Sequence, residues 1–447
     1  MHPACWTDAA SLRFDASVLR SGGAIDLAGR FGAREEVEQA SLSPDGTMAA
    51  FIQPEPGQGS AVYIVDLLGN EQFKPVRILT ADGKPNRLSS CRWTSKSRLL
   101  CTVYALQPLA TGDFGYASRV IAVDSDGGAM KMIENRRGTG RALGISLYGG
   151  DVIDWNAGRE GHVLMVRQYI PEETVGTRGA QTKEGLGVDD IDTVTLRATA
   201  VVRARKDARE YISDGKGTVR IVGDTPSDAS GYDREGRRYF FRRKGVDAWE
   251  PLSMVDMNGN GFDPHRVDPA LDLVYGLDRK DGRRAAFSKA MDGSGQETLL
   301  FAHPQVDVDG FVTIGRDRRT IGVSYATDRR EVHYFDPAIE KLARVLSKAL
   351  PHAPLVRVVD ASDDEQKLLI WAGSDVDPGR YYLLDRPSGR MEIVIASRPQ
   401  LEGVTLAPVK AVTYRAGDGT MIPAYLTLPP GRPATGLPAI VLPHGGP

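Results

Sequence analysis

The residues with the clearest chemical potential in this chain are the last four, His444-Gly445-Gly446-Pro447. They follow an apolar run, Leu437–Pro443, that suits a strand buried on both faces. Glycine has no Cβ, so the backbone of such a turn can approach a substrate carbonyl closely. A fixed N–H aimed at a carbonyl oxygen that becomes negative is one half of an oxyanion hole. A glycine turn that follows a buried strand can therefore supply backbone N–H groups of this kind.

A nucleophile for such a site is not found in the sequence. The nucleophile elbow has the pattern Gly-x-Ser-x-Gly in a strand–turn–helix context. The nearest match is Gly322–Ala326, in which alanine replaces the last glycine and the chain then returns to a strand pattern. We expect Ser324 to be an ordinary strand residue and His444 to have a structural role in its turn. Nucleophile, base and acid cannot be assigned, so we expect these 447 residues alone to be inactive.

Metal and cofactor sites are not indicated, and we expect neither. The seven histidines show no His-x-x-x-His spacing and no clustered acids or cysteines. Two acidic segments, Asp189–Asp192 and Asp256–Asp263, suggest calcium, but the second lacks the full ligand pattern and the final Glu of an EF-hand loop. We interpret them as solvated turns. For the pair Glu172-Glu173, a solvated charge pair in a long loop is favoured.

The composition is that of a globular protein with a sizeable core. Hydrophobic residues make up 41% and charged residues 26% of 447, with a formal net charge of −2. This balance gives no reason to expect a nucleic acid or an anionic membrane as partner, and no apolar stretch approaches the roughly 18 residues of a membrane span. Residues Met1–Asp8 lack a signal-peptide pattern. The default location is therefore cytoplasmic, or periplasmic if the natural start lies upstream; the oligomeric state is left open.

Two of the three cysteines, Cys91 and Cys101, lie symmetrically about Lys96. In a hairpin they would face each other, and a non-hydrogen-bonded cross-strand pair has Cα atoms about 4.5 Å apart, close enough for a disulfide. Free cysteine is commonly buried. The sequence favours two buried thiols and leaves a disulfide open.

A loose repeat of roughly 50 residues organises most of the chain. Its first copy has the turn Ser41–Gly46, the strand pattern Met48–Ile52, and the strand pattern Ala61–Asp66 before another turn. Units of about four short strands at this period indicate a β-propeller, whose blades bury a core together. We predict about seven blades between residues 36 and 402, with six or eight left open, after an N-terminal extension over residues 1–35.

The pattern changes after residue 403. Two strand patterns, Val409–Tyr414 and Met421–Leu428, flank the tight turn Asp418-Gly419, and Ala439–Leu442 reads as a buried strand. A hairpin that leads into a buried strand is typical of the start of an α/β domain. The predicted fold class is thus mainly β, a propeller followed by the first strands of an incomplete α/β-hydrolase domain over residues 403–447.

The segments Tyr414–Tyr425 and Leu437–Pro447, together with the propeller before them, carry a family resemblance. The chain resembles the prolyl oligopeptidase family of serine peptidases, nearest to its acylaminoacyl-peptidase-like and dipeptidyl-peptidase-like members. The C-terminal residues are the specific part of the resemblance, and the rest matches as architecture. It implies a propeller that covers a hydrolase and filters peptides by size, an oxyanion hole that uses Gly446, and a Ser, Asp and His triad downstream of this motif.

The expected function is therefore that of the N-terminal, propeller-bearing part of a serine peptidase that hydrolyses short peptides by acyl transfer. Its partner would be a peptide substrate. Two alternatives remain at this point: a non-catalytic propeller that binds a protein or small solute, and an esterase of the same hydrolase fold. The length and residue preference of the substrate, and exo- versus endopeptidase action, are left open.

Overall fold

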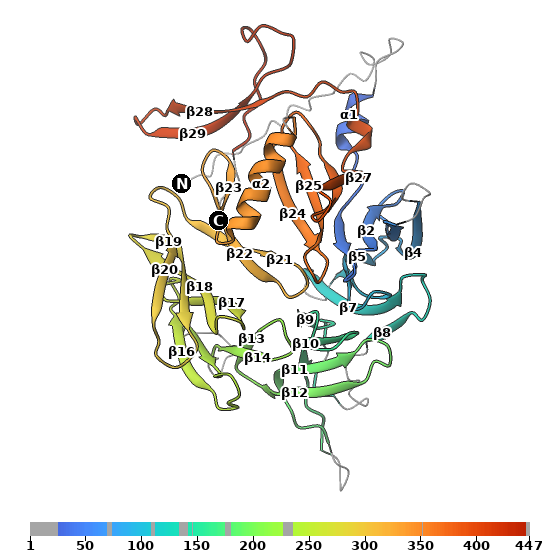
Figure 1. Ribbon diagram of the computed structural model, residues 1–447, viewed down its shortest axis with the longest axis vertical. Coiled ribbons are helices and arrows are strands. Elements are labelled where there is room, and N and C mark those ends of the chain that lie inside the picture. The colour runs from blue at the N-terminus through green and yellow to red at the C-terminus, as the bar shows by residue number, and fades with distance from the viewer. Residues whose placement is uncertain are drawn as a thin grey trace, which may run out of the picture.

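A ring of seven β-sheets forms the body of the molecule (Figure 1). The structure is a computed structural model that describes residues 26–68, 74–108, 112–133, 142–144, 146–174, 180–226, 236–350 and 352–443. Each sheet is built from consecutive antiparallel strands, and the first strands of several neighbouring blades contact one another beside the channel. The sequence prediction of a mainly β, seven-bladed propeller is confirmed.

Blades 1 to 5 each contain four strands in chain order. Their bounds are β1 (Gln39–Leu42), β2 (Met48–Pro54), β3 (Ser60–Asp66), β4 (Pro75–Ala81), β5 (Arg87–Trp93), β6 (Arg98–Pro108), β7 (Phe114–Asp124), β8 (Lys131–Ile133), β9 (Asp151–Asp154), β10 (His162–Tyr169), β11 (Gly185–Asp192), β12 (Ala198–Arg205), β13 (Ala208–Ser213), β14 (Val219–Asp224), β15 (Arg237–Phe241), β16 (Glu250–Val255), β17 (Asp263–Asp268), β18 (Leu273–Lys280), β19 (Arg283–Ala290) and β20 (Glu297–Phe301). The short helix α1 (Leu27–Gly32) precedes blade 1.

Blade 6 differs from the others because a helix follows its third strand. Its strands are β21 (Val308–Ile314), β22 (Arg319–Ala326) and β23 (Arg330–Tyr334), and the helix is α2 (Pro337–Ala349). The Asp336 side chain caps this helix by accepting from the N–H groups of Ala338 and Ile339 at 2.9 and 3.2 Å. The apolar face of α2 buries Ile339 and Leu346 against blades 6 and 7. Blade 7 comprises β24 (Leu355–Ala361), β25 (Lys367–Gly373), β26 (Arg380–Asp385) and β27 (Arg390–Ala396), followed by the 3₁₀ turn η2 (Pro399–Leu401).

The turn between the first two strands has the same form in blades 1, 6 and 7. Its fourth position is Gly46, Arg318 or Glu365, and each donates its N–H to the carbonyl three residues earlier. All three have a positive φ, of 66°, 55° and 53°. Glycine takes this conformation without cost, whereas other residues meet a steric penalty there. Blade 1 thus shows that glycine is a natural occupant of the position that Arg318 holds in blade 6.

Blades 1 and 7 close the ring through side chains and loops, since each described strand belongs to one blade. The Asp360 carboxylate in β24 accepts hydrogen bonds from the Leu42 N–H at 3.0 Å and the Ser41 hydroxyl at 3.1 Å. An apolar cluster that includes Phe51 and Leu369 spans the same junction. The closure therefore depends on a small number of buried contacts.

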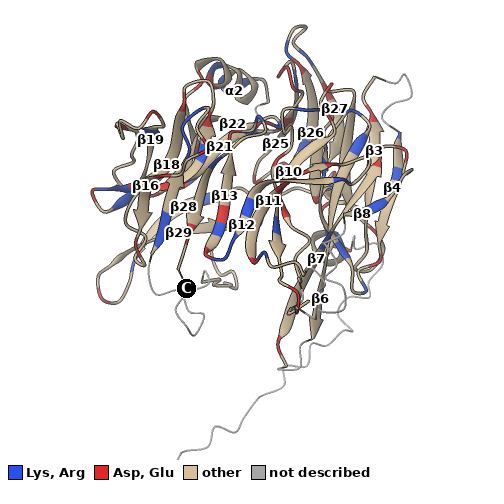
Figure 2. Ribbon diagram, turned by 90° about the horizontal axis from the view of Figure 1, so that it is seen from below, with Lys and Arg blue, Asp and Glu red and all other residues tan. Residues whose placement is uncertain are grey.

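The connections between strands lie alternately on two faces of the ring. We call proximal the face on which the chain enters blade 1 and leaves blade 7, where the Glu36 N–H donates to the Ser397 carbonyl at 2.8 Å. Strand alternation places the β6–β7 connection on the proximal face and α2 toward the opposite, distal face. Figure 2 shows α2 and the extended end of β6–β7 on opposite sides of the molecule.

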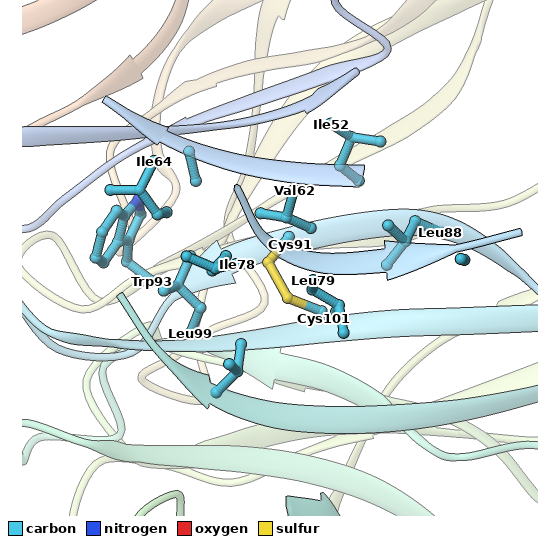
Figure 3. Close-up of a cluster of buried hydrophobic side chains, with 13 residues drawn as sticks. Ile52, Val62, Ile64, Ile78, Leu79, Leu88, Cys91, Trp93, Leu99 and Cys101 are labelled. Carbon is cyan, nitrogen blue, oxygen red and sulfur yellow. A yellow bond between two sulfur atoms is a disulfide. The ribbon is translucent and has the colours of Figure 1, made fainter. Parts of the chain in front are cut away.

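Cys91 and Cys101 form a disulfide in the core of blades 1 and 2 (Figure 3). They are cross-strand partners in β5 and β6, and both are fully buried beside Trp93 and Leu99. The sequence favoured two free thiols, and the structure corrects this. The reason is the register, which places the two residues directly opposite each other.

A chain prepared without reductant should contain this disulfide and only one free thiol. Alkylation under denaturing, non-reducing conditions should therefore modify Cys5 alone by mass spectrometry. The double variant Cys91→Ala/Cys101→Ala should lose about 2–3 kcal/mol of unfolding free energy, because a short loop of about 10 residues is no longer cross-linked in the unfolded state. Alkylation of all three cysteines would contradict the disulfide.

Residues after the propeller form only part of what the sequence predicts. The strands β28 (Val409–Arg415) and β29 (Met421–Thr427) pair as a hairpin. It rests on the proximal face through the Tyr425 hydroxyl, which donates to the Asp328 carbonyl at 2.8 Å. The predicted third strand, Ala439–Leu442, is not formed, and Ile440 is 88% exposed. A strand needs a neighbour for its backbone groups, and none of the described residues provides one.

Candidate functional site

The central channel of the propeller contains a cavity of about 330 Å³. The first strands of blades 3, 4 and 5, which are β9, β13 and β17, form most of its wall. The turn between β21 and β22 of blade 6 supplies the remaining wall with Arg316, Asp317 and Arg318. One face of each of these innermost strands packs against its own blade. The other face carries charged residues that line the cavity.

The turn Gly315–Arg318, which we call the channel-crossing turn, reaches blades on the far side of the ring. Arg316 Nη1 donates to the Thr94 carbonyl of blade 2 at 3.0 Å. Asp317 accepts from Asn156 Nδ2 of blade 3 at 2.9 Å and pairs with Lys216 of blade 4. Since the turn belongs to blade 6, these contacts require it to cross the channel. It obstructs the channel near the distal face, and the cavity extends from it toward the proximal face.

A hydrogen-bonded network of charged side chains lies in the wall of blades 4 and 5. The buried Tyr239 hydroxyl lies 2.6 Å from Glu210 Oε1 and 2.7 Å from Asp263 Oδ1. Arg237 Nη1 donates to the same Glu210 oxygen at 2.8 Å, and His265 Nε2 lies 3.4 Å from Asp263. Burial, followed by the charge of Glu210, raises the pKa of Tyr239 well above its usual range. The hydroxyl therefore stays protonated and acts as a donor.

A second cavity, of about 610 Å³, opens on the proximal side between blades 3 and 4. Tyr148, Asp151 and Lys206 contribute to its wall, and Glu210 lines both this cavity and the channel. A row of aromatic rings runs beside it, with Tyr116 centred 5.5 Å from Tyr104 and 6.1 Å from Tyr148. The proximal face thus offers an apolar surface next to charged groups, which suits the binding of a peptide.

The described residues of this region assemble binding groups. His162 and His265 each pair with a carboxylate, Asp190 and Asp263. What this arrangement provides is recognition of charge and of aromatic or apolar groups.

The structure places some of the sequence-predicted residues and not others. Gly446 and His444 lie outside the described residues. Ser324 lies within β22, paired with Gly310 and Val332, so the prediction of an ordinary strand residue is confirmed. Glu172 exchanges hydrogen bonds with Gln181, its carboxylate accepting the Gln181 N–H at 3.1 Å.

The acidic segments that the sequence interpreted as solvated turns differ from each other. Asp256 behaves as predicted, since its Oδ1 accepts the N–H groups of Asn258 and Asn260 at 2.8 Å in an exposed turn. Asp189 does not, because it is fully buried in β11 and forms an ion pair with the buried Arg167. The sequence prediction for Asp189 is wrong because this residue lies inside a strand, on the side that faces the core.

The channel residues were missed at the sequence level. A usable signal was present in Asp263–Arg266, where charged residues alternate with others at the start of a repeat. The first strand of a blade lies innermost, so charges there point to a polar channel. The sequence around Arg318 does not predict that this residue lines the channel, because it is an ordinary turn sequence.

Comparison with known proteins agrees with the fold. No family model matches this chain. Among curated proteins it is similar to dipeptidyl aminopeptidase BIII of Pseudoxanthomonas mexicana, with 30% identity over 250 residues, covering 53% of this chain and 34% of that protein. It is also 25% identical over 138 residues to dipeptidyl peptidase family member 6 of Caenorhabditis elegans, covering 31% of this chain and 18% of that protein. The chain thus spans about a third of the first relative's length and under a fifth of the second's.

A solved structure shares the propeller. A puromycin-hydrolysing peptidase of Mycobacterium tuberculosis aligns with a TM-score of 0.50 and 14% identity, covering 92% of this chain and 61% of that one. The 250-residue match to the aminopeptidase is also far longer than residues 403–447, so most of it falls within the propeller. The similarity therefore extends well beyond the C-terminal segments in which the resemblance was first found. Architecture and sequence both agree with the resemblance of this chain to the prolyl oligopeptidase family.

Proposed function

We propose that this chain is the propeller-bearing part of a serine peptidase that hydrolyses short peptides by acyl transfer. The observation that carries the proposal is the 30% identity to a dipeptidyl aminopeptidase over a stretch lying mostly in the propeller. The second curated relative is also named as a dipeptidyl peptidase. The nucleophile, base and acid would come from sequence beyond Pro447, since the relatives are much longer than this chain.

Residues 403–447 would be the start of the hydrolase domain of this peptidase. Support comes from the exposure of Ile440, Val441 and Leu442, which are 88%, 83% and 87% accessible. Three consecutive apolar side chains at such exposure need further chain to cover them. The Gly446 N–H would follow directly as an oxyanion donor, a contribution worth roughly 10²–10³ in rate.

The propeller would bind and select the peptide. Its proximal face carries the attached hairpin β28–β29, the 610 Å³ cavity and the row of tyrosine rings. A hydrolase domain that continues from residue 403 would lie over this face. Peptides would then reach it across a polar and aromatic surface, and their size would be limited by the space between the two domains.

A fluorophosphonate probe, which reacts with activated serines, tests the proposal. The 447-residue chain should remain unlabelled, because it has no elbow serine. A longer product of the same gene that reads past Pro447 should be labelled and should release dye from an aminoacyl-peptide substrate. Denatured protein is the control for non-specific reaction.

Three results would contradict the proposal in different ways. Labelling of the 447-residue chain would show a nucleophile within it. A longer product that is folded but unlabelled would favour a non-catalytic binding propeller. A labelled product that cleaves esters and no peptide would favour an esterase.

A further inference from the structure

Two arginines from different blades line the channel cavity, Arg266 in β17 and Arg318 in the channel-crossing turn. A third, Arg92 at the end of β5, is exposed. Burial, followed by the like charges of Arg266 and Arg92, lowers the pKa of Arg318 to about 10. Burial also lowers the pKa of Arg266.

None of these guanidinium groups has a carboxylate partner among the described residues. Arg266 donates through Nη1 to the His265 carbonyl at 2.8 Å, while its buried Nε has no hydrogen-bond partner. The Arg92 guanidinium lies over the Trp155 ring, 5.8 Å from its centre. The Arg318 side chain makes neither an ion pair nor a hydrogen bond within the part of the chain that the structure describes. Arg266 and Arg318 therefore line the cavity without a direct carboxylate partner.

The carboxylates nearby are occupied by other groups. Asp317 accepts from Asn156 and pairs with Lys216. Asp363 forms a two-point pair with Arg316 at 2.9 and 2.6 Å. Asp360 accepts from blade 1, and Asp263 from Tyr239. Among the described residues, none of these acids forms an ion pair with Arg266 or Arg318.

Among the described residues, the buried arginines do have carboxylate partners. Arg98, Arg167 and Arg220 are each at most 5% exposed, and they pair with Asp124, Asp189 and Asp272. Arg266 and Arg318 are half-buried, line a cavity and have no such partner, so an anion from outside could pair with them there. The guanidinium fork matches the geometry of a carboxylate or a phosphate.

We propose that Arg266 and Arg318, assisted by Arg92, bind an oxyanion at the closed end of the propeller channel. The ligand is a carboxylate or phosphate group that enters the 330 Å³ cavity from the proximal side and accepts hydrogen bonds from the two half-buried guanidinium groups. It is carried either by a free small anion or by an acidic peptide. The site depends on the propeller alone and does not require the proposed peptidase activity.

Arg318→Gly is the sharpest variant for a test. Glycine occupies the same turn position in blade 1, at Gly46, with the same hydrogen bond, so the turn should form without strain. Arg266→Met removes the second charge and keeps an apolar stem in the wall. Arg344→Gln is the matched control. It removes one positive charge from the exposed face of α2, and Arg344 does not line the channel cavity.

Titration calorimetry on the 447-residue chain, with inorganic phosphate, succinate and a tetra-aspartate peptide at constant ionic strength, measures the binding. We expect saturable one-to-one binding of at least one of these, weakened at least about tenfold by Arg318→Gly and by Arg266→Met. Arg344→Gln should leave the affinity unchanged. Tighter binding of the peptide than of phosphate or succinate would identify a peptide carboxylate as the ligand; the reverse would identify a free anion.

Thermal melting of each variant, followed by circular dichroism, separates a loss of binding from a loss of folding. A variant that melts like the parent and still binds with parental affinity would overturn the proposal. So would the absence of saturable binding of all three probes by the parent chain. If Arg318→Gly melts lower, Arg318→Asn replaces it, because asparagine also tolerates this conformation.

Discussion

Replacing Asp189 with alanine should lower the free energy of unfolding by about 3–5 kcal/mol. Asp189 is fully buried in β11, and its Oδ2 lies 3.3 Å from Nη1 of Arg167, which is itself only 5% exposed. The Tyr169 hydroxyl also donates to this carboxylate. Its removal leaves a buried positive charge and a buried hydroxyl without their acceptor, and this is why the expected loss is large. Urea unfolding followed by circular dichroism measures it.

The neighbouring residue provides a matched control. Asp190 follows in the same strand and pairs with Arg159, whose side chain is 63% exposed, and with His162 at 2.7 Å. Both partners reach solvent after its removal, so Asp190→Ala should cost less than Asp189→Ala. The double variant Arg167→Met/Asp189→Leu, which removes both buried charges, should recover most of the loss. Equal destabilisation by the two single alanine variants would contradict a buried pair at Asp189.

The second large effect is expected at the junction of blades 1 and 7. Asp360→Ala should cost roughly 2–4 kcal/mol, because the buried Leu42 N–H and Ser41 hydroxyl both lose their acceptor. The same change opens the point where the ring closes, so the unfolding transition should also broaden. Asp360→Asn retains one acceptor oxygen and should cost less.

Comparing the parent with the Asp360→Asn variant at different pH values tests the protonation of Asp360. Burial raises the pKa of Asp360 above its usual 3.8, against the opposing effects of the Leu42 N–H and the charge of Arg92. A raised folded-state pKa means that the folded protein binds the proton more tightly than the unfolded chain does. The stability of the parent relative to Asp360→Asn should therefore rise as the pH falls from neutral through that pKa, and level off below about 3.8. A difference that stays constant, or falls on acidification, would contradict the raised pKa.

The architecture could be predicted because it is repeated. Each blade contains the same short strands and turns, of which Ser41–Gly46 is the clearest copy, so errors in single strands did not affect the fold class. The helix α2 was not predicted, although Asp336 before Pro337 is a usual N-cap signal. It was missed because the repeat led us to expect another strand there.

The candidate site could not be predicted in the same way. Arg318 and Asp317 stand in a polar sequence typical of a solvated turn, and only closure of the ring brings that turn to blades 2, 3 and 4. Asp189 lies in an acidic run whose members have three different environments, fixed by strand register. In both cases the deciding contacts join residues that are far apart in the chain or on opposite faces of one strand.

The channel-crossing turn leaves the proximal face as the expected entrance to the channel. The contacts of Arg316 and Asp317 hold this turn across the distal side of the channel, so we expect a solute to reach and leave Arg266 and Arg318 from the proximal side. Arrival and departure then share one diffusion route through the proximal mouth. A domain that rests on this face would therefore slow both steps together, lengthening the residence time of a bound solute without changing its equilibrium affinity.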